Sequence, residues 1–188
     1  ALSGRQAALF LAGDRAAEQA DIAALLAIAD AAANPAWRAE ALLRQLKNLN
    51  ARGEYAAMAP AADTVVAAAQ AAHQPSIEAR ALCLKAAALT RLGAPASRPT
   101  AEWALARARA ASDEWAIAYA LGMLALHEAY AGDYGRAAEL WTDVYELVRH
   151  GGDRALEARA LSNLGAAYQY LGQFEQARHY LEQGLVLC

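Results

Sequence analysis

Apolar residues recur every three or four positions along most of the chain, and short breaks that contain glycine interrupt this pattern at regular intervals. Near the C-terminus, Leu161, Leu164 and Tyr168 follow the spacing, which places them on one face of an α-helix. The break glycines are 40, 40, 39 and 40 residues apart, at Gly13, Gly53, Gly93, Gly132 and Gly172. A constant period of this length predicts a structural repeat.

A second set of breaks divides each repeat into two helices. These breaks are Asn34-Pro35, Gln74-Pro75, Ser112-Asp113 and Gly151-Gly152-Asp153. Asn34 is expected to cap the helix that begins at Pro35, and Ser112 or Asp113 to cap its counterpart two repeats later. We therefore predict one all-α domain, residues 1–188, of about four and a half helix pairs. Its repeat units are expected at 1–34, 35–74, 75–112, 113–152 and 153–188.

The last repeat places small and large side chains where two crossing helices need them. Gly165 lies seven residues before Gly172 and Ala177 lies five residues after it, and side chains this small allow two helices to approach closely. The other matching positions are Tyr168, Phe174, Leu181 and Gly184. This arrangement closely resembles the tetratricopeptide repeat (TPR). The resemblance implies a right-handed α-α superhelix, a TPR-like solenoid, with a concave groove lined by the inner helices.

The resemblance weakens toward the N-terminus. Around Gly53, Met58 stands where alanine is expected, and around Gly93 the segment APASRPT extends the turn, so the next helix is expected to begin near Thr100. The unit around Gly13 is degenerate or truncated. A period of 40 residues exceeds the usual 34 of the family, which predicts longer helices. HEAT-like pairing of the helices is the structural alternative.

Long repeats of this kind also resemble the helical sensor arms of large bacterial signal-transduction ATPases, including LuxR-type transcription regulators. The resemblance implies that the sequence is a fragment of a longer regulatory protein. In such proteins the arm binds an inducer or a partner protein and controls a nucleotide-binding module elsewhere in the chain.

Charge and composition narrow the range of partners. A net charge of -3 and a pI near 5.8 argue against direct binding of nucleic acid, which requires clustered Lys and Arg. No apolar run approaches the ~18–20 residues of a membrane span, so no membrane contact is expected. Cys83 and Cys188 lack metal-ligand spacing, which favours buried thiols in a reducing, cytoplasmic compartment.

No motif predicts catalysis. His127 begins the segment HEAYA, but Ala131 stands where a zinc-protease helix needs its second histidine. The chain contains neither a GxxxxGK[ST] phosphate loop nor a GxSxG nucleophile elbow. We therefore expect no enzymatic activity, no catalytic residue, no metal site and no cofactor.

The candidate binding residues project from the inner helices away from the packed stripe. They are Lys47, Asn50, Arg80, Arg91, Tyr119, Tyr130, Arg159, Asn163, Gln169 and Tyr170. The tyrosines Tyr119, Tyr130 and Tyr170 are the strongest candidates, because an aromatic ring not used in packing can stack on a peptide or ligand. The alternative is that these residues only solvate the groove or join the core. The family's clamp for a C-terminal carboxylate is incomplete, since among its positions only Asn163 has a suitable type.

Charge is unevenly distributed between neighbouring repeats. Residues 79–111 contain six basic side chains and one acidic, whereas residues 113–146 contain seven acidic and one basic. The simple interpretation is that neighbouring repeats complement each other across solvated faces. The functional interpretation is that the basic repeat, with Arg91 and Arg98, receives an acidic segment of a partner or of the parent protein.

These patterns predict a non-catalytic scaffold for a protein or peptide partner, or for another domain of the parent chain, in a bacterial regulatory or signalling protein. The alternative is a small-ligand sensor domain of a larger ATP-dependent transcription regulator. The apolar ending LVLC of the last helix also predicts that the chain can self-associate through that helix.

Overall fold

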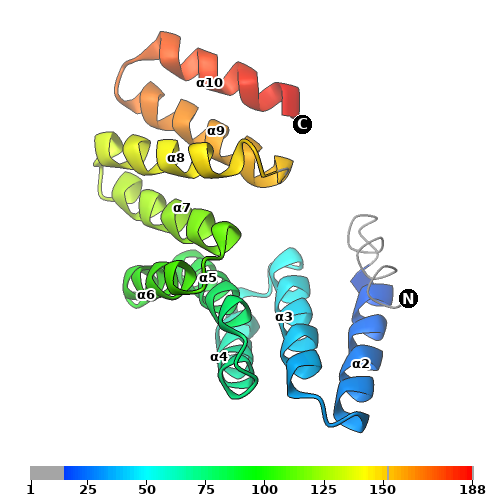
Figure 1. Ribbon diagram of the computed structural model, residues 1–188. Coiled ribbons are helices and arrows are strands. Elements are labelled where there is room, and N and C mark those ends of the chain that lie inside the picture. Colours follow the sequence, from blue (N-terminus) through cyan, green and yellow to red (C-terminus); the bar gives the residue numbers. More distant parts are fainter. Residues whose placement is uncertain (1–14, 152, 188) are drawn as a thin grey trace. The chain divides into compact units, whose positions relative to one another are not determined.

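The chain is all-α over the residues that a computed structural model describes, 15–151 and 153–187. In these ranges it contains nine helices and no strand. Figure 1 labels these helices along the chain. It divides into two compact units, residues 1–100 and 101–188. The predicted all-α class is therefore confirmed, and the prediction of a single domain over residues 1–188 stays a prediction.

Short turns join the successive helices of each unit. The first unit contains α2 (Arg15–Ala31), α3 (Pro35–Ala51), α4 (Tyr55–Ala71) and α5 (Pro75–Arg91). The second contains α7 (Glu114–Tyr130), α8 (Tyr134–Val148), α9 (Arg154–Tyr170) and α10 (Phe174–Leu187). Helix α6 (Ser97–Ala110) spans the boundary between the units.

Helix packing follows the order of the chain and repeats every second helix. In the first unit each helix packs on the next, and α3 also contacts α5. The second unit has the same pattern, because α7, α8, α9 and α10 pack in sequence and α7 also contacts α9. We call α3, α5, α7 and α9 the inner helices and α4, α8 and α10 the outer helices. This alternation is the arrangement expected of stacked helix pairs.

Helix length accounts for the period. Helices α3 and α4 have 17 residues each, and each is followed by a three-residue turn, 52–54 and 72–74. Two such helices and two such turns make forty residues. A helix of this length is about 25 Å long, so each pair presents a long packing face to the next.

Backbone conformation at the turns explains why glycine recurs there. Gly53, Gly93, Gly132 and Gly172 have φ between 66° and 84°, a left-handed conformation that glycine adopts without a steric penalty. At the first of these, Gly53 N donates to Asn50 O and Glu54 N donates to Leu49 O, which closes the C-terminus of α3. The opposite turns use non-glycine residues in the same region, namely Ala33, His73 and Ser112, with φ of 47° to 53°.

Side-chain caps start most of the inner helices. Asn34 Oδ1 accepts hydrogen bonds from the backbone N–H groups of Ala36 and Trp37, both at 3.1 Å, as predicted. Of the two candidates before α7, Asp113 is the cap, because its carboxylate accepts from Ala116 N at 3.0 Å. Gln74 makes no such bond at α5.

Two glycines inside inner helices mark the closest crossings of the second unit. A Cβ added to Gly165 would lie 3.2 Å from the carbonyl oxygen of Ala177, so the predicted contact between these small residues is confirmed. A Cβ added to Gly122 would lie 2.9 Å from two ring carbons of Trp141. Trp141 is only 1% exposed and is the largest fully buried side chain of the described residues.

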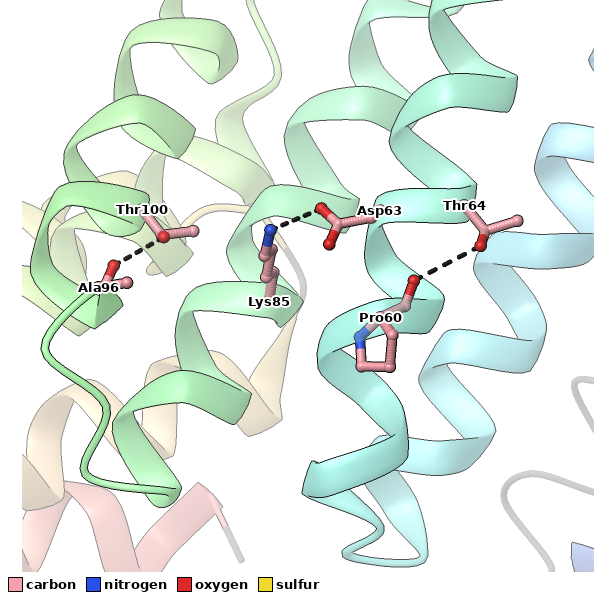
Figure 2. Close-up of polar contacts among 6 residues, drawn as sticks. All are labelled: Pro60, Asp63, Thr64, Lys85, Ala96 and Thr100. Carbon is pink, nitrogen blue, oxygen red and sulfur yellow. Dashed lines mark hydrogen bonds and ion pairs between the residues drawn. The ribbon is translucent and has the colours of Figure 1, made fainter.

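The predicted start of α6 near Thr100 is wrong by three residues. The helix begins at Ser97, because Pro99 fits its first turn, where no backbone N–H is needed. Thr100 Oγ1 donates to the carbonyl of Ala96 at 2.7 Å, as Figure 2 shows. The irregular turn after α5 is therefore shorter than the sequence suggested.

Candidate functional site

The inner helices α7 and α9 of the second unit carry six of the ten predicted binding residues. We call this set, Tyr119, Tyr130, Arg159, Asn163, Gln169 and Tyr170, the inner-helix face. Tyr119 and Arg159 occupy equivalent positions in consecutive repeats, 40 residues apart, and so do Tyr130 and Tyr170. Because α7 and α9 are in contact, equivalent positions on them lie near each other.

Tyr119 is packed rather than free. It is 8% exposed, and its ring centroid lies 4.8 Å from that of Trp115 at an interplanar angle of 31°. The guanidinium carbon of Arg159 lies 4.6 Å from the same centroid, within the range of a cation–π interaction. Trp115 was not among the predicted site residues, although its position four residues before Tyr119 places it on the same helix face.

Arg159 brings a charged group with unused donors to this cluster. The side chain is partly exposed, but its Nε and Nη2 atoms are buried and have no hydrogen-bond partner among the described residues. Native structures leave few buried polar atoms unsatisfied, and each one calls for a physical explanation.

Tyr130 and Tyr170 are the exposed aromatic residues of the inner-helix face. Their exposed fractions are 73% and 69%, and each is the last residue of its helix. Tyr170 stacks on Tyr134, with centroids 4.4 Å apart and an interplanar angle of 6°, so one face of its ring is covered. Gln169 is exposed and Asn163 is partly exposed.

The other four predicted residues lie in the first unit. Lys47, Asn50 and Arg80 are partly buried on α3 and α5, and Arg91 is exposed. The guanidinium carbon of Arg91 lies 6.0 Å from the centroid of Tyr55. Arg91 and Tyr55 are 36 residues apart, as are Tyr170 and Tyr134, so the last residue of an inner helix covers the first aromatic of the preceding outer helix in both units.

The basic stretch is partly neutralised within the first unit. Lys85 Nζ on α5 lies 2.5 Å from Asp63 Oδ1 on α4, as Figure 2 shows. Asp63 lies outside the acidic stretch 113–146, so this pair does not test whether the basic and acidic repeats complement each other. Arg98, the other arginine proposed to receive an acidic segment, is exposed on α6.

The outer surface of α10 carries exposed apolar side chains beside the charged Glu175, Arg178 and Glu182. Phe174 is 67% exposed and Leu185 is 74% exposed, and both line a hollow of about 290 Å³ together with Leu181. Phe174 is the counterpart of Tyr134 one repeat earlier, which Tyr170 covers. No described residue covers Phe174 in the same way.

A tyrosine pair lies between α9 and α10. The rings of Tyr168 and Tyr180 are stacked, with centroids 5.4 Å apart. Partial burial, together with the neighbouring Tyr168, raises the pKa of Tyr180 above its ordinary value, because burial disfavours the phenolate. The pair is one of the contacts between the two helices of the last repeat.

Acidic, histidine and cysteine side chains of the described residues do not gather into a metal site. No group of three or more of them suited to a metal ion occurs among residues 15–151 and 153–187. Within the same part of the chain, every helix is too short or too polar to cross a membrane.

Comparison with known proteins identifies the repeat. A sequence profile of the tetratricopeptide repeat family matches residues 116–186, which cover most of the two repeats, 113–152 and 153–188, that match the family pattern best. No curated protein matches the chain by sequence.

Solved structures extend the similarity to the rest of the chain. BtubC (BKLC) from P. vanneervenii aligns with 99% of this chain and 78% of its own, with a TM-score of 0.72 and 16% identity. A putative kinesin light chain from Podosopora anserina, with nearly identical TPR-like repeats, aligns with 99% of this chain and 92% of its own, with a TM-score of 0.64 and 17% identity. MamA aligns with 97% of this chain and 93% of its own, with a TM-score of 0.53 and 20% identity. Residues 116–186 therefore belong to the tetratricopeptide repeat family, and the chain has the fold of TPR-like repeat proteins.

Proposed function

We propose that the chain is a non-catalytic scaffold that binds a protein or peptide partner through the inner-helix face. The observation that carries this proposal is the exposure of Tyr130 and Tyr170 at equivalent positions of consecutive inner helices. Large aromatic side chains are enriched at binding hot spots, because they bury much apolar area and lose little conformational entropy.

The surroundings of these tyrosines support a rigid binding surface. Both lie at the ends of helices of 17 residues, and Tyr170 is held against Tyr134. A rigid surface loses little conformational entropy when a partner binds. Gln169 adds an exposed amide beside Tyr170, which suits hydrogen bonding to a peptide backbone.

The cellular setting of this scaffold is a finer part of the proposal. It follows from the resemblance to the arms of bacterial regulators and from the two widely separated cysteines. We place the scaffold in the cytoplasm, in a bacterial regulatory or signalling protein, with the partner a separate protein or another domain of the parent chain.

Site-directed photo-crosslinking tests the proposal. A photoreactive phenylalanine derivative replaces Tyr130 in one protein and Glu139, exposed on the outer helix α8, in a control protein. In lysate of the native host, we expect a crosslinked partner from position 130 and none from position 139. Equal crosslinking at both positions, or none at either, would refute binding through the inner-helix face.

We also propose that the chain self-associates through α10, because its exposed apolar side chains lie on one helix face. Phe174, Leu181 and Leu185 are seven and four residues apart, and apolar patches of this kind favour association. Light scattering should show a molecular mass that rises with protein concentration. Leu185→Glu should keep the protein monomeric, whereas the control Gln176→Glu, on the same helix, should still associate. A constant monomer mass in the unmodified protein would rule out this mode.

The small-ligand sensor stays an alternative prediction. A ligand that binds only the folded protein raises its melting temperature. A panel of sugars, nucleotides and short peptides at millimolar concentration that leaves the melting temperature unchanged would count against it.

A further inference from the structure

We propose that two copies of the chain pair through α10 in an antiparallel arrangement with two-fold symmetry. This arrangement rests on the self-association proposed above, and it specifies the orientation of the second copy. The pattern of side chains on the exposed face of α10 selects it.

This face has the side-chain spacing of a helix that packs lengthwise against another helix. Phe174, Arg178, Leu181 and Leu185 are exposed and line the same hollow. Along the chain they are four, three and four residues apart, which is the spacing of the seam between two helices that pack side by side. The face therefore fits a second helix along its length.

The preceding repeat shows what the same positions do when a helix covers them. One repeat earlier, the counterparts of Arg178 and Glu182 are Ala138 and Thr142. Both line a hollow together with Tyr168 of the following inner helix α9, and α8 packs on α9. On α10 one positive and one negative side chain replace these two uncharged ones. The face of α10 therefore fits a helix that carries complementary charges.

The order of the two charges along α10 selects an antiparallel second copy. Placing Phe174 of one copy opposite Leu185 of the other brings the large apolar ends of the two faces together. In this register Arg178 of each copy lies within one residue of the level of Glu182 on the other copy. Two arginine–glutamate pairs then form across the interface, related by the two-fold axis. A parallel pairing would instead place arginine beside arginine and glutamate beside glutamate, which is repulsive.

The ion pair that Arg178 makes within its own helix is compatible with this contact. Arg178 Nη2 lies 2.5 Å from Glu175 Oε2, and both side chains are mostly exposed. A guanidinium has five N–H donors, so donors remain for a second carboxylate. Each Arg178 therefore bridges Glu175 of its own copy and Glu182 of the other.

Reversal of single charges tests the arrangement in the whole chain. Analytical ultracentrifugation under reducing conditions, which keep Cys188 as a thiol, measures the dissociation constant of the dimer. Arg178→Glu and Glu182→Arg should each raise this constant at least about tenfold, because each substitution puts two like-charged pairs into the interface. An equimolar mixture of the two variants should restore dimer formation, since the glutamates of one variant then face the arginines of the other.

A matched variant separates this interface from a general effect of charge. Arg136→Glu makes the same change of charge on the exposed surface of α8, so it should leave the dissociation constant unchanged. In a chain that dimerises, the antiparallel arrangement would be overturned by single variants that dimerise equally well, by a mixture that stays monomeric, or by an equal loss in Arg136→Glu.

The molecular mass of the unmodified protein distinguishes the remaining outcomes. We expect it to level off at twice the monomer mass, because a two-fold interface closes, and growth beyond the dimer would overturn the arrangement. A monomer at every concentration would overturn both the arrangement and the proposed self-association, and would assign the face of α10 to a different protein segment. Partner binding through the inner-helix face is tested separately, by the crosslink at position 130.

Discussion

Replacing Gly122 with alanine tests whether close helix crossing limits the packing of the second unit. Gly122 lies in the middle of α7, and an added Cβ would lie 2.9 Å from Cη2 and Cζ3 of Trp141. The ring is 1% exposed and lies in a close-packed interior, so it has no free space to move into. The new methyl group must therefore displace the indole or the backbone of α7.

Two opposing effects set the magnitude. Overpacking of a core costs about 1–3 kcal/mol, whereas alanine in a helix interior is favoured over glycine by about 1 kcal/mol. Gly184→Ala is a control, because its Cβ would lie 3.4 Å from Leu161 Cβ, close to an ordinary contact. Both variants gain helix propensity, so we expect Gly122→Ala to be less stable than Gly184→Ala by about 1–3 kcal/mol.

Urea unfolding followed by circular dichroism measures the difference. In a Trp141→Leu background the smaller side chain leaves room for the methyl group, so the cost of Gly122→Ala should shrink by about 1 kcal/mol or more. The packing argument would be refuted if Gly122→Ala were at least as stable as Gly184→Ala. It would also be refuted if the stability lost through Gly122→Ala were the same in the Trp141→Leu background.

Three further predictions concern caps, turns and a tyrosine. Asn34→Ala should lower the free energy of unfolding by about 0.5–2 kcal/mol, because it removes the cap of α3. Gln74→Asn should raise that free energy, because it adds a cap to α5. Urea unfolding measures both variants, and equal urea midpoints for the two would contradict the role of the caps. Gly172→Ala should lower the free energy of unfolding by about 1–2 kcal/mol, because alanine is strained at a φ of 73°. Apart from the neighbouring residues of the chain, no atom lies within 4 Å of the added Cβ, so no steric clash contributes. An unchanged thermal midpoint would contradict this prediction. Because the pKa of Tyr180 is raised in the folded protein, the phenol of the unfolded chain ionises at lower pH than the folded one. The contribution of Tyr180 to the free energy of unfolding is therefore complete below about pH 10 and is lost as the pH rises above it. Tyr180→Phe should make this loss shallower in urea unfolding at a series of pH values, and an identical pH profile would contradict the raised pKa.

The helix pairs were predictable because their signals are local. A turn that needs a positive φ selects glycine, as at Gly53 and Gly172, and an N-terminus that needs an acceptor selects a residue such as Asn34. The close contact of Gly165 with Ala177 was also predictable, because it follows from side-chain size at fixed distances from a turn. The start of α6 was not, since Pro99 suits both a loop and the first turn of a helix.

The candidate site was predictable only in part. Helical offsets place Tyr119, Tyr130, Arg159 and Tyr170 on inner helices, because position along a regular helix determines its face. They do not distinguish the exposed Tyr130 from the packed Tyr119. That distinction depends on neighbours in three dimensions, here Trp115 and Arg159.

The sequence by itself determined the period, the helix pairs and the small residues at the crossings, since each depends on interactions within a few residues or on a repeating distance. Only the tertiary structure decided which side chains remain exposed and which charges lack a partner. Arg159 is the clearest case, because its missing acceptor is a property of everything packed around it. Burial and hydrogen-bond satisfaction are sums over contacts between distant residues, and no spacing along one chain contains that information.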